Sequence, residues 1–220
     1  MSGNALKLMA AAAMLLDHMG ILLFPRMEIF RILGRLALPI YAYMIAEGCK
    51  YTRSRRRYLG GILGLAAVCQ AVYFIADGTW YLSVLFTFSA AIVTIYALQN
   101  LKSNPSPGRA LVLAGVVAGI WLLNREITID YGFWGCMLPV WPAVFQGTSW
   151  DRKEVHVAML GLGLVALWMA IGGWQLWSLA ALPLLLLYSG KRGKWKLKYF
   201  FYIFYPLHLA ALQVLAWVIN

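Results

Sequence analysis

Two ionisable residues interrupt the first apolar run of the sequence. Asp17 and His18 stand in the stretch "MLLDHMGILLF", where every neighbour is apolar or glycine. An ionisable side chain at membrane depth is costly, so it faces protein or a water-filled cavity and usually marks a functional path. A neutral imidazole there can take the proton of an attacking amine or hydroxyl, or carry an acyl group itself. The pair therefore predicts chemistry or proton movement inside a membrane.

Two arginines follow in the next apolar run. Arg31 and Arg35 are four residues apart, which places them on one face of a helix. From the helical rise, His18 lies roughly 9 Å and Arg35 roughly 10 Å from the adjoining ends of their helices, at nearly one level. Asp17 and His18 diverge by about 100° around their helix, so we expect Asp17 to pair with an arginine rather than orient His18. A role that only joins the two helices remains the alternative.

A further set of polar residues comes later in the chain. Asp130 and Tyr131 stand in "NREITIDYGFWG", where a solvated outer loop is the alternative to a role in the site. His208 stands in "FYPLHLAAL", roughly 14 Å into the last apolar run, where the alternative is a hydrogen bond between helices. The three histidines of the chain are too dispersed to predict a metal site.

The elements that must position these residues are membrane helices. The chain has 220 residues, of which 62% are hydrophobic and 12% charged, with a mean hydropathy of +0.72. We expect one all-α domain over residues 1–220, a polytopic bundle of about nine transmembrane helices. The apolar runs that predict them are 5–24, 28–49, 59–76, 81–99, 109–123, 132–147, 155–171, 174–189 and 199–218. The breaks between them are too short for a separate soluble catalytic domain.

The distribution of basic residues predicts the orientation of this bundle. With the N-terminus in the cytoplasm, 15 of the 19 lysines and arginines fall in inner loops, and only Arg26 and Arg125 fall in outer loops. The 15 are Lys7, Lys50, Arg53, Arg55, Arg56, Arg57, Lys102, Arg109, Arg152, Lys153, Lys191, Arg192, Lys194, Lys196 and Lys198. Topology thus accounts for the net charge of +11 without a nucleic-acid partner. We expect a cytoplasmic N-terminus.

Two basic runs, "KYTRSRRRY" and "KRGKWKLKY", have two interpretations. They can be orientation signals that also contact anionic lipid. Alternatively, Arg53, Arg55, Arg56 and Arg57, or the lysines within residues 191–198, can dock the phosphates of a cytoplasmic donor.

Four stretches together resemble a known family. They are "LKLMAAAAMLLDHMGILLFP", "FRILGRLALPIYAYMIAEG", "DYGFWG" and "FYIFYPLHLAAL", and in this order and spacing the chain resembles the TraX family, named for a membrane protein that acetylates conjugative pilin. The resemblance implies an integral protein of the bacterial cytoplasmic membrane that moves an acyl group from cytoplasmic acyl-CoA to an amine or hydroxyl at the outer side. The family's motif positions fall on Asp17, His18, Arg31, Arg35, Glu47, Gly48, Asp130, Tyr131 and His208.

The resemblance and the residue pattern together assign expected roles. His18, Asp17 and Arg35 are expected to be catalytic. Arg31, Asp130, Tyr131 and His208 are expected to bind the acceptor, which is a peptide, glycan or small molecule. Acetyl-CoA is the expected donor, and no metal is expected. The rival hypotheses are a proton-coupled transporter or flippase that uses the buried Asp, His and Arg cluster, and a non-catalytic scaffold; the lack of a detectable inverted repeat weighs against transport.

The charge pattern yields a first testable prediction. A membrane-impermeant thiol probe should label a cysteine placed within residues 124–131 from outside intact cells. A cysteine placed within residues 53–57 should react only after permeabilisation, because the basic loop faces the cytoplasm. The reverse labelling pattern would contradict the orientation.

Overall fold

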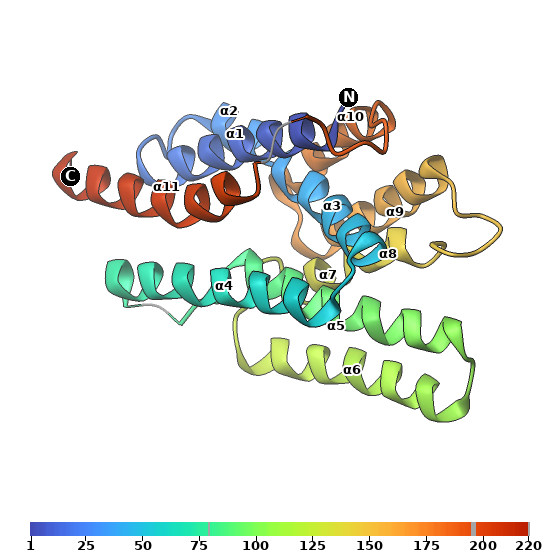
Figure 1. Ribbon diagram of the computed structural model, residues 1–220. Helices are drawn as coiled ribbons and strands as arrows, with labels where there is room; N and C mark the ends of the chain where they lie inside the picture. The colour runs from blue at the N-terminus through green and yellow to red at the C-terminus, as the bar shows by residue number, and fades with distance from the viewer. Residues whose placement is uncertain (79, 195–196, 220) are drawn as a thin grey trace.

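The computed structural model describes residues 1–78, 80–194 and 197–219. Within these residues the fold is helical, and the only β-type pairing is an isolated bridge between Leu82 and Ile129. In chain order the helices are α1 (Gly3–Leu22), α2 (Glu28–Gly34), α3 (Ala37–Tyr51), α4 (Arg55–Asp77), α5 (Val84–Ser103), α6 (Pro107–Glu126), α7 (Gly132–Met137), α8 (Val140–Ala143), α9 (Lys153–Ile171), the 3-10 helix η1 (Gly173–Ala181), α10 (Leu182–Leu186) and α11 (Lys198–Ile219). Figure 1 shows α1, α4, α5, α6 and α11 running in roughly common directions, with α3 and α9 inclined to them.

Local sequence signals set the helix ends. Ser2, Ser54 and Ser106 are N-caps, and each side chain accepts a hydrogen bond from the backbone N–H three residues later. Pro107 occupies the first turn of α6, where its missing N–H costs nothing. Gly78 ends α4 in the left-handed conformation that glycine adopts without strain.

Seven helices among the described residues are long and apolar enough to cross a membrane. They lie at Gly3–Leu22, Glu28–Tyr51, Arg55–Ile75, Val84–Ser103, Pro107–Glu126, Lys153–Ile171 and Phe200–Ile219. The predicted helices at 132–147 and 174–189 are instead broken into the short pieces α7 with α8, and η1 with α10. The expected count of nine is therefore not confirmed, because an apolar run does not by itself ensure a continuous helix.

The bundle has one end rich in cations, here called the basic end. It holds residues 1–7, 50–57, 102–109, 146–153 and 186–194, which contact one another through hydrogen bonds and ion pairs. The N-terminus lies near this end and the C-terminus lies far from it (Figure 1). The fold thus gathers the basic loops together, as the charge pattern predicts, while the side of the membrane that they face stays a prediction.

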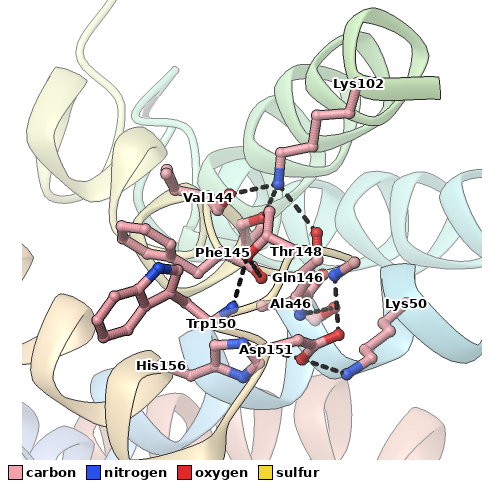
Figure 2. A network of polar contacts seen from close by, with 12 residues as sticks. Ala46, Lys50, Lys102, Val144, Phe145, Gln146, Thr148, Trp150, Asp151 and His156 are labelled. Atoms are coloured by element: carbon pink, nitrogen blue, oxygen red, sulfur yellow. Dashed lines mark hydrogen bonds and ion pairs between the residues drawn. The ribbon is translucent and has the colours of Figure 1, made fainter. Parts of the chain in front are cut away.

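Lys50 and Lys102 fasten the loop after α8 at the basic end (Figure 2). The Nζ of Lys102 donates to the carbonyls of Ala143 and Gln146, each at 3.0 Å, and to that of Val144, which satisfies the free carbonyls at the end of α8. Lys50 Nζ lies 2.7 Å from a carboxylate oxygen of the same loop. These cations thus have structural partners.

The acceptor of the Lys50 contact is Asp151, which organises the rest of this loop. Its second carboxylate oxygen accepts a hydrogen bond from the Gly147 N–H at 2.8 Å, and His156 Nε2 lies 3.2 Å from its first. His156 is therefore part of a structural cluster at the basic end, as Figure 2 shows.

Helix α3 lies at the centre of the bundle, in contact with α1, α5, α8, α9 and η1. By contrast α6 contacts mainly α5 and α7, and its side chains Leu111, Val112 and Leu122 are exposed. Exposed apolar side chains on a long helix are what contact with lipid requires. The site described below lies around the central helices and not at this outer layer.

The expected helix at 28–49 has an irregular turn at Arg35. Helix α2 ends at Gly34 and α3 starts at Ala37, but Arg35 and Leu36 keep right-handed helical dihedrals, so α2 and α3 form one span, Glu28–Tyr51. A β-carbon at Gly34 would collide with the side chain of Asp17. The missing side chain of Gly34 lets α1 approach this turn closely and brings Asp17 beside Arg35.

Candidate active site

Asp17 binds both arginines of the second apolar run. Its Oδ1 lies 2.6 Å from Nη2 of Arg35, as a hydrogen-bonded ion pair, and 3.0 Å from Nη1 of Arg31. The contact with Arg31 lacks hydrogen-bond alignment, so that Nη1 remains an unsatisfied donor. The pairing expected from the spacing is present, and the trio of one carboxylate and two guanidiniums carries one excess positive charge.

Arg35 uses its remaining donors to bind its own helix and two other segments. Its Nε donates to the Arg31 carbonyl, and its Nη1 donates to the Tyr131 hydroxyl and to Oε1 of Gln175, all at 3.3 Å. Arg35 is buried, at 8% exposure, and these acceptors offset the cost of burying its charge. Arg35 therefore acts as the connection among α1, α7 and η1.

Gln175 is a site residue that our sequence reasoning missed. It is 3% exposed, and its Nε2 has no hydrogen-bond partner among the described residues. A weaker signal was available, since Gln175 is a polar residue in the apolar run "GGWQLWSLAALPLLLL". The rule that selected Asp17 covers only ionisable side chains, so it did not select Gln175.

The second half of the site is a pair of histidines from the two ends of the chain. His18 Nδ1 lies 2.8 Å from His208 Nε2, joining α1 to α11. His208 Nδ1 in turn lies 2.8 Å from the Phe204 carbonyl, and the Phe204 ring stacks on the imidazole at 4.8 Å. The helix-to-helix hydrogen bond considered for His208 thus exists, and its partner is the expected catalytic histidine.

The loop before α7 brings Asp130 and Tyr131 to the same site. The backbone of Asp130 is fixed by its N–H, which donates to the Leu82 carbonyl at 2.9 Å, and by its carbonyl, which accepts from the Thr87 hydroxyl at 2.7 Å. Tyr131 has a left-handed φ of 61°, which is uncommon for a residue with a side chain and costs free energy. The bridge to Leu82 holds this strained turn so that the Tyr131 ring faces Arg35.

A cavity of about 700 Å³ connects this site to the basic end. One face of α1 lines it through Lys7, Met14, Asp17 and His18, whose spacing follows the helical repeat. Its other lining residues include Glu47, Tyr58, Asp130, Tyr131, Arg192 and Tyr205. A cavity of this size holds a drug-sized molecule or a long flexible arm. His18 and Asp130 therefore share a space that also reaches the basic end.

The arginines expected to dock a donor lie away from this cavity. Arg55 donates to Gln99 Oε1 at 3.0 Å, and neither it nor Arg53, Arg56 or Arg57 is in the cavity lining. Among the described residues, the lysine and arginine in that lining are Lys7 and Arg192. The docking role of the four arginines remains a prediction.

The carboxyl group of Asp130, in this loop, has a pKa well above its ordinary value. Burial raises the pKa of its carboxyl to about 6, while the hydrogen bond from the Tyr81 hydroxyl, at 2.6 Å, and the charge of Arg35 limit that rise. Burial and the Asp130 charge also raise the pKa of Tyr131, so its hydroxyl stays protonated. Tyr81 was not selected from the sequence.

This acidity predicts how stability depends on pH. A carboxyl whose pKa is raised on folding favours the folded state at low pH, and this contribution is lost as pH rises from about 4 through about 6. Asp130→Asn stays neutral and still accepts from Tyr81. The Tm of the variant minus the Tm of wild type should therefore increase as the pH rises through this range. The corresponding change in the difference between their free energies of unfolding is at most about 3 kcal/mol. A Tm difference that is constant from pH 4 to pH 7 would contradict the assignment.

Comparison with known proteins identifies a family that matches nearly the whole chain. The profile of the TraX protein family matches residues 2–216. The chain is 28% identical to the probable fimbrial assembly protein FimC, serogroup H1, of Dichelobacter nodosus over 246 aligned residues, which cover 96% of this chain and 94% of that protein. It is 26% identical to protein TraX of Escherichia coli, with 97% of this chain and 86% of that protein covered.

A third similarity is local. An uncharacterized protein of Rickettsia prowazekii, RP591, is 45% identical over 40 residues, which cover 18% of this chain and 16% of that protein. No solved structure matches. Because the family profile covers nearly the whole chain, including Asp17, His18, Asp130 and His208, the protein belongs to the TraX family.

Proposed function

We propose that the protein is an integral-membrane acyltransferase, with acetyl-CoA as donor and an amine or hydroxyl as acceptor. The observation that carries the proposal is the cavity that joins Lys7 and Arg192 at the basic end to His18. Lys7 and His18 both lie on α1, eleven residues apart, or roughly 16 Å along the helix. A donor whose phosphates stay at the basic end can thus extend its thioester arm to the imidazole.

His18 is the group proposed to act on the reacting atoms. As a base, it takes the proton of the acceptor amine or hydroxyl while that atom attacks the thioester carbonyl. The carbon–sulfur bond then breaks, and the CoA thiolate leaves with the proton returned from His18. If His18 instead attacks first, the same atoms pass through an acyl-imidazole that the acceptor cleaves. Both routes give the acylated acceptor and free CoA.

The ionic trio has a separate role in the proposal. Arg35 is fully engaged with acceptors and lies outside the cavity lining, so it positions Asp17 and Tyr131 and does not contact substrate. Arg31 is more exposed, with 29% of its side chain accessible, but its Nη1 is buried beside Asp17 and the residue is also outside the cavity lining. The role expected for Arg31 in binding an anionic group of the acceptor therefore stays a prediction.

The acceptor class follows from the relatives. The Dichelobacter relative is named as a probable fimbrial assembly protein, which favours a peptide acceptor such as a fimbrial subunit. The acceptor enters from the opposite end of the bundle, and that end faces the outside of the bacterial cytoplasmic membrane if the basic end is cytoplasmic.

Purified protein in detergent should consume acetyl-CoA and acetylate a fimbrial-subunit peptide, and His18→Ala should lower the transfer rate by about 1,000-fold. Binding of acetyl-CoA, measured by calorimetry, should persist because the imidazole carries no charge that this substitution would leave unpaired. A folded variant that transfers acyl groups at the wild-type rate would disprove the role of His18.

The matched control is Asp17→Asn at the neighbouring position. It leaves the buried guanidinium of Arg35 and the partly exposed one of Arg31 without their carboxylate, and should destabilise the fold by about 3 to 5 kcal/mol, seen as a lower yield and Tm. If wild-type protein does not consume acetyl-CoA and instead moves protons or anions across proteoliposomes, the transporter hypothesis replaces the acyltransferase.

The position of the donor phosphates can be tested with matched sets of cations. Neutralising Lys7 and Arg192 together, each to Gln, should raise the KM for acetyl-CoA at least about tenfold with little change in kcat. The comparison set is Arg53→Gln with Arg56→Gln, two exposed residues outside the cavity lining. A rise in KM confined to the second set would place the donor on the basic run at the start of α4.

A further inference from the structure

The two histidines of the site form an ordered chain of hydrogen bonds that fixes which nitrogen carries each proton. The chain runs from the Phe204 carbonyl to His208 Nδ1, and from His208 Nε2 to His18 Nδ1. A carbonyl oxygen only accepts hydrogen bonds, so His208 Nδ1 must carry a proton at its end. The direction of the hydrogen bond between His208 and His18 follows from this one.

A neutral His208 protonated on Nδ1 has its lone pair on Nε2. That nitrogen lies 2.8 Å from His18 Nδ1 and can only accept, so the proton between them belongs to His18 Nδ1. A neutral His18 then carries its lone pair on Nε2, which makes no hydrogen bond or ion pair among the described residues. His18 is in the cavity lining and His208 is not.

His208 is held more firmly than His18. It is 6% exposed, stacks on the Phe204 ring and meets the Tyr205 ring edge-on at 5.5 Å. Since its ring orientation is set by α11 itself, it can impose an orientation and a tautomer on His18, as partners behind a functional imidazole commonly do.

We propose that His208 is a positioning residue that holds His18 in the tautomer protonated on Nδ1, so that Nε2 is the nitrogen that reacts. The role rests on the proposed acyl transfer. When His18 Nε2 takes the acceptor's proton, the Nδ1–H bond to His208 Nε2 shares the positive charge over both rings. The charge disappears when the CoA thiolate receives that proton.

The tautomers can be measured directly by nitrogen NMR of protein carrying ¹⁵N-labelled histidine in nanodiscs. The chain has three histidines, and His156→Gln identifies the signals of the one that lies in the separate cluster at the basic end. For His18 we expect a protonated Nδ1 and an unprotonated Nε2. His18 protonated on Nε2 in an active protein would overturn the inference while leaving the proposed function standing.

Two variants of His208 separate positioning from packing. His208→Leu fills the space without an acceptor, and should lower kcat about 100-fold while the KM for acetyl-CoA stays unchanged and the His18 tautomers become mixed. His208→Gln supplies an amide oxygen that accepts from Nδ1–H, and should recover at least tenfold of this loss. His156→Gln should keep the wild-type rate.

The outcomes separate the inference from the proposed function. Equal rates for His208→Leu and wild type, or the same single His18 tautomer in both, would overturn the positioning role. If the Leu variant does not fold, the tautomer in wild type and the rate of the Gln variant still decide. A wild-type protein that shows the expected tautomer but transfers no acyl group would support the histidine arrangement and contradict the proposed function.

Discussion

The structure depends on one buried ionic contact, the pairing of Asp17 with Arg31 and Arg35. A carboxylate and two guanidiniums in an apolar bundle are tolerated only if each charge is paired and hydrogen-bonded. Arg35 meets this requirement by reaching α1, the turn before α7 and the 3-10 segment η1 at once. Elements from distant parts of the sequence are thereby held around the turn that joins α2 to α3.

This constraint explains several local departures from regular structure. The helical turn at Arg35 is irregular, and Gly34 leaves room for Asp17. Tyr131 adopts a left-handed conformation that is stabilised by the contacts of its neighbours and not by its own preference. Strained backbone and buried charge both gather here, which is typical of functional sites and rare in regions that serve packing alone.

The histidine pair differs in kind from the ionic trio beside it. Its hydrogen bonds need no formal charge, so it can remain neutral in an apolar surrounding and still gain or release a proton during a reaction. The cavity reaches His18 of this pair from the basic end, whereas His208 and Arg35 are not in its lining. We therefore propose two separate roles: the charged residues around Asp17 hold the helices together, and the His18 ring faces the substrate.

The sequence alone predicted the all-helical class of the fold and one pairing within the candidate site. Long apolar runs with few charges favour membrane helices, and an Asp, a His and two Arg residues inside such runs must find partners. The pairing of Asp17 with an arginine followed from helical spacing, because Asp17 and His18 point in different directions on α1.

Only the tertiary structure decided which distant residues complete the site and which of the predicted helices are interrupted. The partners of His18 and Arg35 are 190 and 140 residues away, and helical periodicity carries no information about contacts between helices that far apart. The interruptions within residues 132–147 and 174–189 were missed for a related reason. The mean hydropathy of a segment reports only whether it prefers water or an apolar surrounding. Whether a helix can break there depends on the hydrogen bonds that its freed backbone groups make with neighbouring elements.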